Sequence, residues 1–146
     1  MATAQLATFE LGGTLFGVPV ERVQEVLRSQ PRTPVPLAPP AVDGLLNLRG
    51  QVVTALDLRT RLCLPDPAET GPGGESGEPM NVVVRAADEV VSLLVDVIGE
   101  VVDVSDDAFE PPPATLVGPA RELVHGAYKL DGRLLLALDI DRVVDI

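Results

Sequence analysis

Much of this chain alternates apolar and polar residues with a period of two, which is typical of strands that bury one face. Gly12-Gly13 predicts a tight hairpin turn between the first two strands, and Pro19 predicts a single helical turn through Arg22. Five prolines from Gln30 to Pro40 cannot donate ladder hydrogen bonds and predict an extended or connecting loop, with a recognition ligand for another domain as the alternative. The alternating segments predict strands over residues 5–11, 14–18, 23–27, 51–56, 80–85, 90–95 and 133–138.

The chain contains an internal repeat. Residues 42–62 and 124–144 align without a gap, and seven of the 21 positions are identical. A weaker echo matches Val23–Val26 with Val101–Val104. Since each copy of a repeat is one supersecondary unit formed in the same way, we expect two related halves.

Each copy of the repeat contains a glycine turn signal, then a strand, then a short segment with helical spacing. Asp57 and Asp139 follow the strands, where an aspartate can accept hydrogen bonds from the free N–H groups of a helical turn. A catalytic carboxylate dyad is the alternative reading of the two aspartates. Aspartic proteases, however, place the aspartate before Thr/Ser-Gly, whereas these two follow Ala-Leu. Helix capping explains both positions at once.

The composition favours an aliphatic β-core and two differently charged halves. Only four residues are aromatic, so Val, Leu, Ala and Ile must form most of the core. Residues 1–65 hold six arginines against five acids, net +1, while residues 66–146 hold five bases against 17 acids, net −12. Such a distribution suits a connector with two partners, and it is equally explained as an acidic surface that keeps the protein in solution.

Several function classes are disfavoured by composition. An acidic chain without a basic stripe lacks the residues that neutralise phosphates and stack on bases, so we expect no nucleic acid partner. The most apolar region, residues 90–104, is interrupted by acids, so we expect no membrane insertion and a cytoplasmic location. Cys63 is the single cysteine and is expected to be a buried thiol. With one histidine and one cysteine we expect no metal site and no cofactor.

Four stretches, in this order, resemble the CheW-like domain family of bacterial chemosensory systems. They are FELGGTLFGVPVERVQEVL, VDGLLNLRGQVVTALDLRTRLCL, NVVVRAADEVVSLLVDVIGEVVDV and LVHGAYKLDGRLLLALDIDRVV. The most specific element is GLLNLRG at residues 44–50. The resemblance covers almost the entire chain from Phe9 onward and favours the stand-alone coupling protein over a domain fused to a kinase or receiver.

The resemblance implies a mainly β fold of two five-stranded SH3-like barrels related by internal duplication, with short helices. The subdomains are expected at roughly residues 14–65 and 80–144. A flexible loop at residues 65–79, rich in Gly, Pro and Glu, is expected to link them, and the terminal strands are free to cross over.

The resemblance also implies a non-catalytic adaptor that is recruited to receptor arrays. Its expected partners are the cytoplasmic tip of methyl-accepting chemotaxis receptors, near the groove between the subdomains, and the regulatory domain of the chemotaxis histidine kinase, at exposed strand ends and hydrophobic edges. Glu25 and Arg49 look like the family's paired acid and arginine, and the pair either fixes a strand against a turn, contacts a partner, or does both. The partner-binding residues implied are Val23, Glu25, Asp43, Gly44, Asn47, Arg49 and Gly50, with Asp43 departing from the family's basic or neutral residue.

Two other functions are weighed against this adaptor. An SH3-type peptide binder needs a groove lined by aromatic residues, which four scattered ones do not supply. The same coupling role in a pathway that controls gene expression or surface motility fits the sequence equally well, because no residue reads the output.

Overall fold

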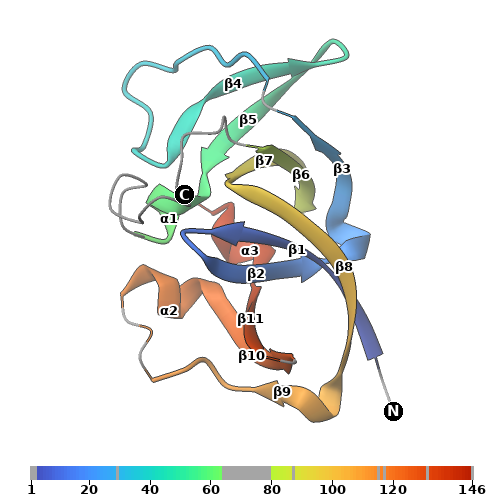
Figure 1. Ribbon diagram of the computed structural model, residues 1–146. Coiled ribbons are helices and arrows are strands. Elements are labelled where there is room, and N and C mark those ends of the chain that lie inside the picture. Colours follow the sequence, from blue (N-terminus) through green and yellow to red (C-terminus); the bar gives the residue numbers. More distant parts are fainter. Residues whose placement is uncertain are drawn as a thin grey trace.

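The computed structural model of the protein describes residues 3–28, 30–63, 80–86, 88–114, 116, 118–130 and 132–145 (Figure 1). The loop predicted at residues 65–79 therefore lies outside the described residues, as does Asp131. The strands are β1 (Thr3–Leu11), β2 (Thr14–Pro19), β3 (Val23–Leu27), β4 (Val42–Leu48), β5 (Gln51–Asp57), β6 (Met80–Ala86), β7 (Glu89–Val95), β8 (Val97–Ser105), β9 (Phe109–Glu110), β10 (Val124–Leu130) and β11 (Arg133–Leu138), and the helices are α1 (Leu58–Arg61), α2 (Pro119–Leu123) and α3 (Ile140–Val143). All seven strands predicted by period-two patterning are present, within two residues at each end.

The strands form two sheets that each combine both halves of the sequence. Sheet A has the order β8-β1-β2-β11-β10-β9, and sheet B has the order β3-β6-β7-β5-β4. The N-terminal hairpin β1–β2 thus joins the second copy of the repeat, while β6–β7 joins the first copy. The sheets group the strands differently from the sequence ranges 14–65 and 80–144, and how the chain divides into subdomains stays a prediction.

Equivalent strand pairs have the same register in the two sheets. In sheet B, Ala55 of β5 pairs in parallel with Ser92 of β7. In sheet A, Ala137, the repeat partner of Ala55, pairs in parallel with Gly17 of β2. This correspondence of register, from one sheet to the other, confirms the related halves.

The register corrects the weaker echo that the sequence suggested between β3 and β8. Val26 of β3 pairs with Val82 of β6, and Val101 of β8 pairs with Ala7 of β1. Ala7 and Val82 occupy equivalent positions in the hairpins β1–β2 and β6–β7. Val26 therefore corresponds to Val101 and not to Val104. Strands rich in valine match themselves at several shifts, so their letters alone do not fix an alignment.

The fold class is confirmed as mainly β with short helices. Sheet B has five strands, as expected, and sheet A has the five equivalent strands plus the two-residue β9. Within the described residues neither strand order returns to its first strand, so neither sheet closes into a ring through backbone hydrogen bonds.

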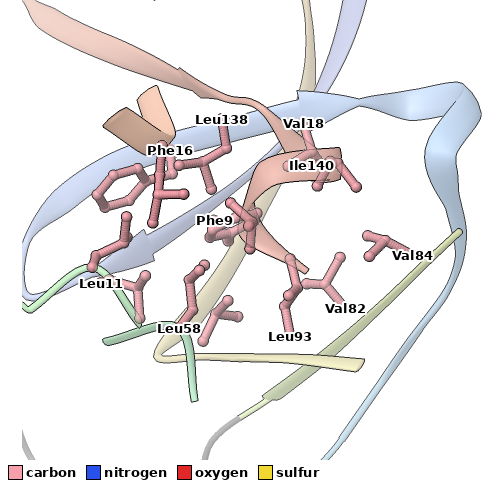
Figure 2. Close-up of a cluster of buried hydrophobic side chains, with 14 of the residues drawn as sticks. Phe9, Leu11, Phe16, Val18, Leu58, Val82, Val84, Leu93, Leu138 and Ile140 are labelled. Atoms are coloured by element: carbon pink, nitrogen blue, oxygen red, sulfur yellow. The ribbon is translucent and has the colours of Figure 1, made fainter. Parts of the chain in front are cut away.

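A shared hydrophobic core lies between the sheets, and each sheet has a smaller core of its own. Figure 2 shows part of the shared core, in which Phe9 of β1 and Leu93 of β7 lie near Leu58 of α1 and Ile140 of α3. The rings of Phe9 and Phe16 stack with centroids 6.3 Å apart. Leu46 and Val53 belong to the small core of sheet B. Aliphatic residues dominate all three cores, as the composition predicts.

The two repeat helices begin as the sequence predicts. The carboxylate of Asp57 accepts a hydrogen bond from the Thr60 N–H at 3.2 Å, and that of Asp139 accepts one from the Arg142 N–H at 3.4 Å. Each aspartate thus caps a helical turn, which confirms the capping interpretation. None of the helices among the described residues has the length and apolar character needed to span a bilayer.

The structure differs from the sequence predictions at helix α2 and at Cys63. Helix α2 was not predicted, although Gly118 with φ 66° followed by Pro119 at the first helical position is a recognisable start signal. Cys63 is exposed and not buried, because it follows the end of α1 in a left-handed conformation with φ 56°. Its N–H donates to the Thr60 carbonyl at 3.0 Å, so the residue closes the helix at the surface.

Candidate partner-binding site

The candidate site begins at the tip of the β4–β5 hairpin. Leu48 pairs with Gln51, which leaves Arg49 and Gly50 as a two-residue turn with φ values of 52° and 87°. Positive φ at both central residues is the geometry that matches the twist of paired strands. The side-chain oxygen of Asn47 accepts a hydrogen bond from the Gly50 N–H at 2.8 Å. Arg49 is thus held in a conformation that residues with a side chain seldom adopt, a kind of strain that clusters at functional sites.

Glu25 of β3 and Arg49 form a two-pronged ion pair. Arg49 Nη1 donates to Glu25 Oε2 at 2.6 Å, and Nη2 donates to Oε1. The hydrogen bond from Arg49 lowers the pKa of Glu25, and the hydrogen bond to Glu25 raises the pKa of Arg49. The arginine side chain remains 69% exposed, whereas the glutamate side chain is 19% exposed. The pair therefore presents one face of a guanidinium to solvent from a fixed position.

This pair joins the two ends of sheet B. Strand β3 is the first strand of the sheet and β4 is the last, and no backbone pairing connects them. The Glu25–Arg49 contact supplies that connection through side chains, so it fixes a strand against a turn. Direct contact of Arg49 with a partner is compatible with its exposure and stays a prediction.

Asp43 and Gly44 lie at the opposite end of β4, beneath the proline-rich loop (residues 30–40). The Arg32 guanidinium pairs with the Asp43 carboxylate. Thr33 and Leu45 exchange two backbone hydrogen bonds, each 2.8 Å long. A Cβ on Gly44 would lie 2.6 Å from the Thr33 carbonyl oxygen, so only glycine lets the loop approach β4 this closely.

The structure therefore separates the seven residues of the predicted site. Glu25, Asn47, Arg49 and Gly50 gather at the hairpin tip, and Asp43 and Gly44 hold the proline-rich loop. Val23 packs against the shared core. Partner contact by each of the seven residues stays a prediction.

Three arginines that the sequence analysis did not single out tie distant segments together. Arg22 forms an ion pair with Asp141 of α3 at 3.2 Å, and Arg59 of α1 pairs with Asp96. Arg61 donates to three carbonyl groups around the end of α3 at 2.8–2.9 Å, those of Arg142, Val143 and Asp145. Arg59 and Asp141 occupy equivalent repeat positions with opposite charge, but the repeat gives no signal for their partners, because Asp96 and Arg22 lie outside it.

Exposed apolar side chains occur at equivalent places on the two sheets. Val26 of β3 corresponds to Val101 of β8, and Val52 of β5 corresponds to Leu134 of β11. All four are among the large hydrophobic residues that the fold leaves exposed. The repeat thus preserves apolar positions at the surface as well as in the core, which distinguishes them from scattered exposed residues.

Comparison with known proteins gives these features a context. The family model described as "CheW-like domain" matches residues 5–146. A chemotaxis protein CheW of Treponema pallidum is 30% identical over 139 residues, covering 95% of this chain and 81% of that protein. A chemotaxis protein CheW of Rhizobium meliloti is 31% identical over 143 residues, covering 95% of this chain and 86% of that protein.

A solved structure resembles the whole fold. The crystal structure of the scaffolding protein TtCheW from Thermoanaerobacter tengcongensis is similar with a TM-score of 0.83 and 25% identity, covering 100% of this chain and 90% of that one. The two sheets therefore form an architecture already seen in a solved structure. The chain belongs to the CheW-like domain family.

Proposed function

We propose that the protein is a non-catalytic adaptor in bacterial chemotaxis signalling. It couples methyl-accepting chemotaxis receptors to the regulatory domain of the chemotaxis histidine kinase. The observation that carries the proposal is the match of the family model to residues 5–146, together with the likeness of the whole fold to a scaffolding protein. Recruitment to receptor arrays in the cytoplasm follows from this role.

The geometry of the described residues supports a role in holding partners. Two sheets share one buried core, so the surfaces of both are fixed relative to each other. Each sheet exposes apolar residues at equivalent positions, and sheet B adds the exposed guanidinium of Arg49. A rigid scaffold with separate apolar and charged contact surfaces is suited to binding two proteins at once.

Reconstitution tests the adaptor role. Receptor cytoplasmic fragments on vesicles are sedimented with the kinase in the presence and absence of this protein. We expect the kinase to sediment with receptors only when the protein is added, and the kinase autophosphorylation rate to respond to the receptors only then. Kinase recruitment without the protein, or transfer of phosphate from the kinase to the protein, contradicts the proposal.

Arg49→Glu tests the hairpin tip. The change replaces the exposed guanidinium with a carboxylate that faces Glu25, so we expect kinase recruitment in the ternary sedimentation assay to fall about tenfold or more. Arg133→Glu is the matched control, because Arg133 follows the glycine turn of the second hairpin and is also partly exposed. If Arg49→Glu recruits as much kinase as Arg133→Glu and the unaltered protein do, Arg49 makes no contribution to assembly.

A further inference from the structure

The proline-rich loop presents an uncharged, exposed surface. No charged residue occurs from Thr33 to Val42, although most of these residues are accessible to solvent. Leu37 is fully exposed, with a relative accessibility of 104%, and the neighbouring prolines 34, 36, 39 and 40 are exposed as well. An apolar surface bordered by charged groups, here the Arg32–Asp43 ion pair, is typical of a site for another protein.

Leu37 also has an unusual backbone conformation. Its φ is 62°, in the left-handed region that Gly, Asn and Asp favour and that a leucine adopts only at a cost. The Ala38 N–H donates to the Val35 carbonyl at 3.4 Å and closes the turn that contains Leu37, and the Val42 N–H donates to the Pro39 carbonyl at 2.9 Å in the next turn. Folding alone would be served better by asparagine or glycine at this position, so the apolar side chain calls for another explanation.

The base of the loop is fixed to β4. The two backbone hydrogen bonds between Thr33 and Leu45 and the Arg32–Asp43 ion pair hold it at two adjacent points. Gly44 is buried beneath the Thr33 carbonyl, so it has no surface of its own for a partner to contact. Any contribution of Gly44 to binding must act through the position of the loop above it.

We propose that Leu37 is an apolar anchor that inserts into a hydrophobic pocket on the kinase regulatory domain, and that Gly44 is a positioning residue for this anchor. The proposal rests on the adaptor function and names one of its contact surfaces. The loop lies beside β4, an edge strand of sheet B, on the side of the molecule away from sheet A (Figure 1). A partner bound between the two sheets would not reach it, whereas a globular domain docked on the end of sheet B would. A pre-formed loop that presents one large apolar side chain loses little conformational entropy on binding.

Leu37→Asn tests the anchor. Asparagine tolerates positive φ, so we expect the variant to unfold at the same temperature as the wild type or higher. We expect its affinity for the full-length kinase, measured by titration calorimetry, to fall about tenfold or more, since anchors in apolar pockets carry much of the binding energy. Leu37→Met keeps an apolar side chain on the same backbone and should bind within about threefold of the wild type.

Cys63→Asn is the matched control. Cys63 is also exposed and also has a positive φ, 56°, so asparagine is introduced at a comparable backbone position outside the loop. Wild-type affinity is expected. Receptor binding should be unchanged in all variants. Wild-type affinity of Leu37→Asn for the kinase, or a loss of receptor binding with kinase binding intact, overturns the anchor. Failure of the unaltered protein to bind either partner overturns the adaptor function itself.

A double-mutant cycle tests Gly44. Gly44→Ala pushes the Thr33 carbonyl away and should weaken kinase binding, with the fold retained as judged by circular dichroism. If Gly44 acts through the loop, the same change made in the Leu37→Asn protein causes a much smaller further loss. Equal losses in the two backgrounds would show that Gly44 acts independently of Leu37 and would overturn its positioning role.

Discussion

Equivalent strand pairs have the same register in the two sheets, but the two sheets hold their outer strands in place differently. In sheet B, the Glu25–Arg49 ion pair joins β3 to the β4–β5 turn. In sheet A, the position of Glu25 is taken by Glu100, which lies in a bulge of β8 opposite Thr8 of β1, and the repeat position of Arg49 is Asp131. Two acids cannot form such an ion pair. Duplication therefore preserved the backbone arrangement while the charge pairing diverged.

The segments that pair with β4 and with β10 at the edges of the two sheets also differ. In sheet B one backbone bridge at Thr33 covers β4. In sheet A the short strand β9 covers β10, and the Phe109 ring packs against His125 and Tyr128 with centroids 5.2 and 5.3 Å apart. His125 lies in β10 beside this ring, with its side chain exposed. Sheet A thus adds aromatic packing to a Lys129–Glu110 ion pair of 3.3 Å, where sheet B has the Arg32–Asp43 ion pair, so salt and pH should affect the two sheets unequally.

Phe9→Ala should have the largest effect and tests whether the sheets are energetically independent. Phe9 is fully buried in the shared core, so its loss should lower the free energy of unfolding by about 3–5 kcal/mol. Because that core contacts both sheets, we expect a single cooperative transition in urea, followed by circular dichroism and by tyrosine fluorescence from Tyr128 in sheet A. Two separate transitions would show that each sheet is stable alone.

Gly126→Ala and Gly44→Ala compare the two covers directly. A Cβ at Gly126 would lie 2.2 Å from the Phe109 ring and 2.8 Å from the Glu110 carbonyl oxygen, whereas at Gly44 it meets the Thr33 carbonyl at 2.6 Å. We expect losses of about 2–3 kcal/mol for Gly126→Ala and about 1–2 kcal/mol for Gly44→Ala by urea denaturation. The reverse order would mean that β9 yields more easily than the proline-rich loop.

Arg61→Ala tests a tie that exists in one half only. Arg61 binds three carbonyl groups around the end of α3, while its repeat counterpart, Val143, is a buried core residue. We expect a loss of about 1–2 kcal/mol in thermal or urea unfolding, because hydrogen bonds from a charged donor are lost. Arg121→Ala, which removes one hydrogen bond of 3.2 Å at the surface, should cost less than about 0.5 kcal/mol. Similar values for both would deny Arg61 a special role.

Glu25→Gln should have the smallest effect at neutral pH and tests the charge dependence of sheet B. Arg49 lowers the pKa of Glu25 in the folded protein, so the pair's contribution is present above the unfolded pKa of about 4.3 and disappears as pH falls through the lower folded value. The stability difference between wild type and variant should therefore shrink below about pH 4 and in high salt. A difference that is constant from pH 7 to pH 3 would contradict an ionic contribution.

Local features were predictable from the sequence because they depend on neighbouring residues. Period-two alternation located the strands, and the aspartates of the repeat identified the helix caps. Family resemblance also singled out Glu25 and Arg49, which do pair. Helix α2 could have been found from Gly118-Pro119, since that signal is local too.

Tertiary structure alone decided how the strands combine and which side chains meet across them. Alternation fixes which face of a strand is buried but not which strand lies beside it, so the exchange of hairpins between sheets was not readable from the pattern. Gly44 is required by a loop eleven residues earlier in the chain, and Arg61 by a helix end 81–84 residues later. Such contacts arise only when distant segments are brought together by the shared core, because no local preference encodes them.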